Sequence, residues 1–168
     1  ELRREAEDAI EGVADKLEEL AAEAARQAAE NRDQALESSA ERDDRSRSGS
    51  DQEQADFEKR EELQRALENQ EALSSEVDSL RSEMEALERI MEEAGQADPE
   101  FRRQLEELQE LLSQMTGDDL QESMEELAEA LRQEDMNQAN RSLEEMAVEQ
   151  EGFRDRLEQS LERFKRAA

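Results

Sequence analysis

Acidic side chains are the most abundant groups in this sequence that can do chemistry. Glutamates four residues apart, such as Glu106 with Glu110 and Glu125 with Glu129, share one face wherever the chain is helical. Two carboxylates can act as general acid and base when they face each other across an enclosed cleft. On the outer face of an amphipathic helix they are solvated charges instead, and we favour this interpretation for both pairs.

Other catalytic and metal-binding side chains are scarce. The sequence contains no His and no Cys, which excludes an imidazole base, an imidazole ligand and a thiolate nucleophile. The di-iron sites of helical bundles need Glu-x-x-His pairs. Calcium accepts oxygen ligands, but no Asp-x-Asp-x-Asp-Gly loop is present, and Gly117-Asp118-Asp119 is explained more simply as a helix start. We therefore expect no enzyme activity and no catalytic, cofactor-binding or metal-binding residue.

The chain is strongly acidic, with 50 Asp and Glu against 22 Lys and Arg and a formal net charge of -28. Nucleic-acid phosphates and anionic membrane surfaces attract clustered Lys and Arg, so both would repel this chain. No apolar run is long enough to span a bilayer. We expect a protein partner, which is either a second copy or a basic or helical protein. Without cysteines the sequence does not indicate a compartment.

The composition is typical of long helices and coiled coils, since 43% of the residues are charged and 2% are aromatic. Residues that favour strands are rare. We predict an all-α protein in which residues 46–54 form a flexible linker; a phosphorylated Ser/Arg segment is an alternative for this stretch. An amphipathic helix is predicted before the linker, over residues 1–45. After it we predict an elongated helical hairpin over 55–168, with helices at 55–94, 99–115, 118–133 and 136–166.

An apolar stripe along the two long helices is the strongest pattern. Between Leu63 and Ala94 the apolar residues alternate at spacings of three and four, and this alternation predicts left-handed knobs-into-holes packing. Residues 136–166 carry a matching stripe. The predicted coiled-coil seam consists of Leu63, Leu73, Val77, Leu80, Met84, Leu87, Met91, Leu143, Met146, Phe153, Leu157 and Leu161.

Two glutamines, Gln70 and Gln150, interrupt this seam. A polar seam residue lowers stability but can fix the register of the helices. If the second long helix returns antiparallel along the first, the two amides come opposite each other and can form a hydrogen bond. Gly152 either permits a close approach of a neighbouring helix or is a tolerated defect that costs about 1 kcal/mol.

Residues typical of helix ends support the predicted boundaries. Asp98, Asp118 and Asp135 are predicted N-caps, and Pro99 suits the first helical position, where its missing N–H costs nothing. Gly95 suits a left-handed residue after the end of a helix.

The two short helices are predicted to form the tip of the hairpin. Methionines occur at seam positions near this tip, and Met115, Met124 and Met136 make it a possible partner-binding surface, because methionine adapts to different helices. Packing in a core where several helices converge is the alternative interpretation.

The segments PEFRRQLEELQELLSQM and DDLQESMEELAEALRQEDMNQANRSLEEMAVEQEGFRDRLEQSLERFKR resemble part of large bacterial membrane-anchored coiled-coil proteins of an uncharacterised domain family. The likeness covers residues 57–168. It implies a helical stalk outside the membrane, with anchors beyond this segment, and it implies no catalytic residue. The sequence starts with Glu1 rather than Met, and we expect it to be a piece of a larger bacterial protein.

These patterns together predict a non-catalytic structural stalk or spacer that acts through helix–helix association. The alternative is an acidic adaptor that binds a basic protein or a partner helix through its outer faces or its methionine-rich tip.

Overall fold

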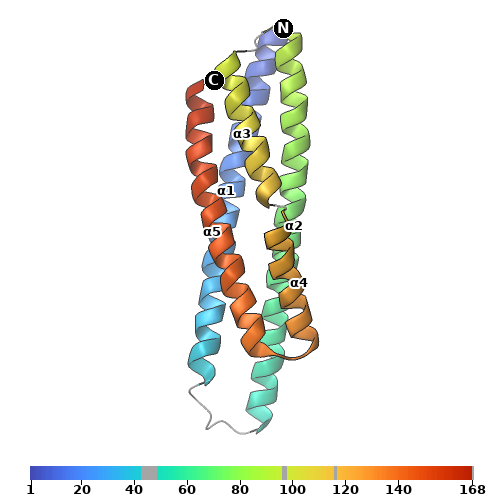
Figure 1. Cartoon of the computed structure of the whole chain (residues 1–168), viewed down its shortest axis with the longest axis vertical. Helices are drawn as coiled ribbons and strands as arrows, with labels where there is room; N and C mark the ends of the chain where they lie inside the picture. The colour runs from blue at the N-terminus through green and yellow to red at the C-terminus, as the bar shows by residue number, and fades with distance from the viewer. Residues whose placement is uncertain (43–48, 96–97, 116, 168) are drawn as a thin grey trace. The chain divides into compact units, whose positions relative to one another are not determined.

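The computed structural model describes residues 1–42, 49–95, 98–115 and 117–167, with side chains for the same residues except 37–56 and 119. The described residues contain helices and no strands, which confirms the predicted all-α class (Figure 1). The helices are α1 (Leu2–Arg42), α2 (Gly49–Glu93), α3 (Pro99–Met115), α4 (Asp118–Arg132) and α5 (Met136–Ala167).

The predicted linker differs from the structure at its second half. Helix α2 begins at Gly49, so residues 49–54 are helical, whereas residues 46–48 lie outside the described part of the chain. Long helices tolerate polar runs when neighbouring turns already pack, because propagation is easier than nucleation. The other predicted helix bounds agree with the structure to within one residue at 99–115, 118–133 and 136–166.

Two of the three predicted N-caps are present. The Asp98 carboxylate accepts a hydrogen bond from the Glu100 N–H at 3.1 Å, and Pro99 is the first helical residue of α3. The Asp135 carboxylate accepts one from the Gln138 N–H at 3.2 Å. Asp118 is itself the first helical residue of α4, one place after the capping position, so its carboxylate acts on the helix dipole instead.

Left-handed residues close two helix ends. Gly95 has φ +66° after α2, as predicted for a glycine there. After α4 the left-handed residue is Glu134, with φ 58°. Its N–H donates to the Leu131 carbonyl at 3.3 Å, and the Asp135 N–H donates to the Ala130 carbonyl at 2.9 Å. This pair of bonds is a Schellman motif, which satisfies carbonyls that α4 would otherwise leave unpaired.

The chain divides into two compact units that share three helices. The first unit comprises Glu1–Ala24, Leu73–Gly117 and Gly152–Ala168, and the second comprises Ala25–Ala72 and Asp118–Glu151. Helices α1, α2 and α5 contribute residues to both units, whereas α3 belongs to the first and α4 to the second. Each unit is therefore built from four helical segments, so α1 is part of the packed structure rather than a separate domain.

The first unit buries large apolar residues from all four of its segments. Phe101 of α3 and Phe164 of α5 form its aromatic contact, with ring centroids 5.1 Å apart. Arg163 pairs with Glu107 and Arg156 donates to Gln114, so α3 and α5 run antiparallel here. The buried residues include Leu17, Leu20, Leu73, Val77, Leu80, Met84, Leu87, Leu105, Leu108, Leu112, Phe153, Leu157 and Leu161.

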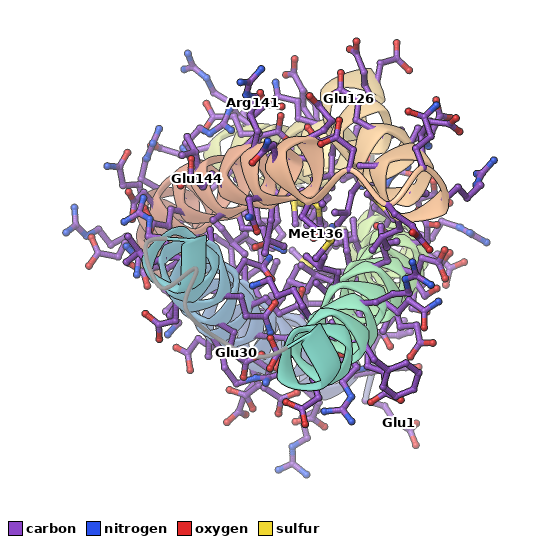
Figure 2. All side chains as sticks on the ribbon, turned by 90° about the horizontal axis from the view of Figure 1, so that it is seen from below. Glu1, Glu30, Glu126, Met136, Arg141 and Glu144 are labelled. Carbon is purple, nitrogen blue, oxygen red and sulfur yellow. The ribbon has the colours of Figure 1, made fainter. Side chains whose placement is uncertain are left out.

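The second unit has its own core. Leu63 and Ala66 of α2, Leu127 and Ala130 of α4, and residues of α5 pack together with Ala35 of α1. Figure 2 shows Met136 on the inside of these segments, while Glu30, Glu126, Arg141 and Glu144 lie on the outside. All twelve residues of the predicted seam are buried in one unit or the other.

The predicted antiparallel pairing of α2 with α5 requires a correction. In the second unit Arg60 pairs with Glu134 just before α5, and Gln70, further along α2, contacts Gln150, further along α5. The two helices thus run in the same direction there (Figure 1). The reason is that a single helix, α4, lies between them in this unit's chain order. Helix α4 runs opposite to α2, and α5 runs opposite to α4, as in up-and-down bundles. Helix α5 therefore has the same direction as α2.

The predicted two-helix tip requires the same correction, because α3 and α4 each complete a different unit. Met115 is buried in the first unit, whereas Met124 and Met136 are partly buried against the core of the second. The methionines of the predicted partner-binding tip are therefore core residues of two units and do not form one exposed surface.

Candidate functional site: a buried amide cluster

Four amide side chains meet inside the second unit. They are Gln27 and Asn31 of α1, Gln70 of α2 and Gln150 of α5, and their exposed fractions are 3%, 4%, 0% and 0%. We call these four residues the amide cluster. Buried amides are costly unless they form hydrogen bonds, so the bonds among them determine what the cluster does.

Gln150 is the centre of the amide cluster. Its Oε1 accepts a hydrogen bond from Asn31 Nδ2 at 2.9 Å. Its Nε2 donates to Gln70 Oε1 at 2.5 Å and to Gln27 Oε1 at 3.3 Å. One side chain thereby links α5 to both α1 and α2, using its acceptor and its donor group at once.

A further bond joins α1 to α2 beside the cluster. Gln27 Nε2 donates to the backbone carbonyl of Asn69 at 3.1 Å. The Nε2 of Gln70 is buried and donates no hydrogen bond within the described part of the chain. Gln70 thus takes part through its oxygen alone, and Gln150 carries more of the polar contacts than Gln70 does.

Lys59 makes a second directional contact between α1 and α2. Its side chain is buried, with 7% exposed, and its Nζ donates to the Gln34 carbonyl of α1 at 2.5 Å. The position lies four residues before Leu63, so Lys59 extends the seam of α2 with a polar head group. The aliphatic part of the Lys59 side chain is buried between the helices, while its ammonium group donates to the carbonyl.

The amide cluster can align helices but has no group for acid–base or covalent catalysis. Amides neither titrate near neutral pH nor act as nucleophiles, and their donors and acceptors are directional. The glutamates first considered for chemistry, Glu106 with Glu110 and Glu125 with Glu129, are exposed. No group of three or more acidic residues is arranged to hold a metal ion among the described residues.

Each unit also has an open groove with acidic walls. In the first unit a groove of about 530 Å³ lies between α1 and α2, above the buried Leu20 and Leu80. Its walls carry Lys16, Glu19, Glu23, Glu76 and Glu83, and Lys16 pairs with Glu83. In the second unit a groove between α4 and the start of α5 includes Glu125, Glu126, Glu129, Arg132 and Asp135.

Sequence reasoning placed Gln70 and Gln150 together but missed Gln27 and Asn31. The missed signal is the spacing along α1, where Leu17, Leu20, Ala24, Gln27 and Asn31 alternate at intervals of three and four. Following only the apolar residues leads from Ala24 to Ala28 and passes over both amides. The spacing alone assigns Gln27 and Asn31 to the buried face.

Protein-family models, curated protein sequences and solved structures give no match to this chain. The resemblance to membrane-anchored bacterial proteins therefore stays a prediction. Among the described residues, no helix contains an apolar stretch that is long enough to cross a membrane.

Proposed function

We propose that this chain is a non-catalytic structural element, a helical spacer or stalk within a larger bacterial protein. The observation that carries the proposal is that every residue of the predicted seam is buried within one chain. The predicted seam is thus covered by other residues of the same chain. Such a module holds its neighbours apart and leaves a charged surface exposed.

The surface chemistry supports the same proposal. Ion pairs between helices, such as Arg32 with Glu151, Arg102 with Glu92 and Lys165 with Glu18, lie on the outside and are partly exposed. Exposed pairs of this kind each contribute about 0–1 kcal/mol to the free energy of unfolding, so they add little stability. They favour the native pairing of helices over other pairings. The resemblance of residues 57–168 to membrane-anchored coiled-coil proteins agrees with a stalk.

An acidic adaptor is the second candidate, and the groove of the first unit favours it. Glu19 and Glu76 stand on opposite walls above Leu20 and Leu80, which suits a basic amphipathic helix. The methionines do not support the adaptor, because they are buried or partly buried in the cores.

Light scattering of the chain at low and high salt tests the spacer. We expect a monomeric mass in both conditions, because the seam is already covered. A dimer at both would contradict the proposal and make self-association the function.

Calorimetric titration with an arginine-rich helical peptide tests the adaptor. If the adaptor is right, the pair Glu19→Gln and Glu76→Gln weakens binding. The matched pair Glu85→Gln and Glu93→Gln makes the same change of charge on residues outside the groove and leaves binding intact. If both pairs of substitutions lower the affinity for the peptide equally, binding depends only on net charge, and this outcome favours the spacer.

A further inference from the structure

The contacts of α1 in the second unit are unusual for a helix in a bundle. Between residues 25 and 36 its buried side chains are Gln27, Ala28, Asn31 and Ala35. The one large apolar residue in this stretch, Leu36, is 62% exposed. Over residues 25–36, two amides and two alanine methyl groups therefore make up the buried face of α1 in the second unit.

Apolar contacts of this size do not determine a register. An apolar seam repeats every seven residues, so a helix that slides by one repeat buries a similar area. Alanine offers little area in either position. The native register of α1 must therefore be distinguished from shifted registers by directional contacts, which are hydrogen bonds.

The amide cluster supplies those directional contacts. Asn31 and Gln27 both bond to Gln150, and Gln27 also reaches the Asn69 carbonyl. A slip of seven residues moves Asn31 about 10 Å along the helix axis. It leaves buried donors and acceptors of α1 and α5 unpaired, and this cost penalises every shifted pairing.

We propose that the amide cluster selects the pairing of α1 with α2 and α5, and that it rejects pairings shifted by one repeat, both within the chain and between copies. Gln150 is the positioning residue, because its side chain makes three bonds of the cluster, two to α1 and one to α2. This role is independent of whether the chain acts as a spacer or as an adaptor.

Cysteine cross-linking in the full chain tests the proposal, since the chain has no cysteine of its own. Arg32 and Glu151 form an ion pair at 2.6 Å beside the cluster, so Arg32→Cys with Glu151→Cys reports the native register. Arg32→Cys with Glu144→Cys reports a slip, because Glu144 is exposed one repeat before Glu151 on α5 (Figure 2). A short bismaleimide reagent joins whichever pair is close.

The test variant replaces the cluster with apolar residues of similar size: Gln27→Met, Asn31→Leu, Gln70→Met and Gln150→Met. We expect the parent chain to cross-link at 32–151 and hardly at 32–144. We expect the variant to remain helical and to show at least a several-fold rise in 32–144 cross-linking or in covalent dimers. Gln104→Met removes a buried amide of α3 in the first unit, and we expect it to leave the parent pattern unchanged.

A helical, monomeric variant that cross-links only at 32–151 would overturn the proposal. If the fourfold variant loses its helicity, the double variant Asn31→Leu with Gln150→Met is tested in the same way. Loss of helicity in both would also count against the proposal, because the cluster would then be needed for folding itself and not for choosing among folded pairings.

Discussion

Gln150 donates a hydrogen bond to Gln70 across 2.5 Å in the interior of the second unit, although the two residues are 80 positions apart in the chain. Neither side chain has exposed surface. The bond joins two helices that run in the same direction and whose other contacts in this unit are mainly apolar. The two partners are unequal, because Gln150 makes three of the bonds of the amide cluster and Gln70 makes one.

This inequality predicts unequal costs of substitution. Gln150→Met removes three bonds of the amide cluster at once, including the side-chain bonds of the buried Asn31 and Gln70, and an unsatisfied buried group costs about 1–3 kcal/mol. We expect a loss of about 3 kcal/mol or more in the free energy of unfolding. Gln70→Met ends one bond and also removes the buried Nε2 that donates none, so we expect about 1 kcal/mol or less.

Urea denaturation of the two variants measures this difference. Equal losses would mean that the bonds of Gln150 to α1 contribute nothing, and would also weaken the case for it as the positioning residue. Gln104→Met serves as the control for removal of a buried amide outside the cluster.

The seam of the first unit leads to a second prediction. Leu80 and Leu87 are 4% and 1% exposed, and Leu80→Asp with Leu87→Asp places two carboxylates in the core. Because a buried unpaired charge and a lost leucine each cost several kcal/mol, we expect the first unit to unfold.

Circular dichroism and thermal melting record the loss of helix in this double variant. Leu36→Asp is the matched control, since Leu36 is 62% exposed and its replacement should change the free energy of unfolding by less than about 0.5 kcal/mol. Unchanged melting of the double variant would show that the assigned core is wrong.

The glycines give a third prediction, and they settle a question that the sequence left open. A Cβ added at Gly152 would meet only Arg156 Nη2, at 3.9 Å, so the glycine permits no close approach and is a tolerated defect. Gly152→Ala should raise the free energy of unfolding by about 0.5–1 kcal/mol, because alanine restricts the unfolded chain and favours helix.

Gly117 is the contrasting position for the same measurement. A Cβ there would lie 2.9 Å from the Gln114 carbonyl oxygen, which is backbone and cannot move aside. Gly117→Ala should lower the melting temperature while Gly152→Ala raises it. A gain in stability at Gly117 would contradict the geometry of this turn.

The local parts of the fold followed from the sequence, and the reason is physical. The bounds of α3 and α5, the caps at Asp98 and Asp135 and the left-handed Gly95 depend on neighbours in the chain. The direction of α2 against α5 does not, since the same seam pattern fits either direction. The spacing of apolar residues also does not determine whether α3 and α4 pack against each other as a hairpin or each belong to a different unit.

The amide cluster shows where hydrophobicity misleads. Gln70 and Gln150 stood out because large apolar residues surround them in the sequence. Gln27 and Asn31 lie among alanines, where the contrast between polar and apolar positions is weak. Their role in the structure depends on Gln150, which lies 123 residues from Gln27 and 119 from Asn31, and no local pattern contains that contact.

The excess of acidic residues has a consequence for how stability depends on salt. The chain carries 50 acidic and 22 basic residues, so we expect repulsion among the acidic residues to outweigh the attraction within the ion pairs. In the first unit Glu19, Glu23, Glu76 and Glu83 line one groove with Lys16 as the only basic residue among its lining residues. The ion pairs there and elsewhere are partly exposed, and salt screens attraction and repulsion alike.

The last prediction is that added sodium chloride raises the melting temperature, because the repulsion that it screens is stronger than the attraction. Replacing Glu76 by Gln should raise the melting temperature at low salt and have a smaller effect at high salt. Glu85→Gln, outside the groove, should raise it less at low salt. A melting temperature that falls with salt would show that the ion pairs between helices, and not the acidic surface, dominate the electrostatics of this chain.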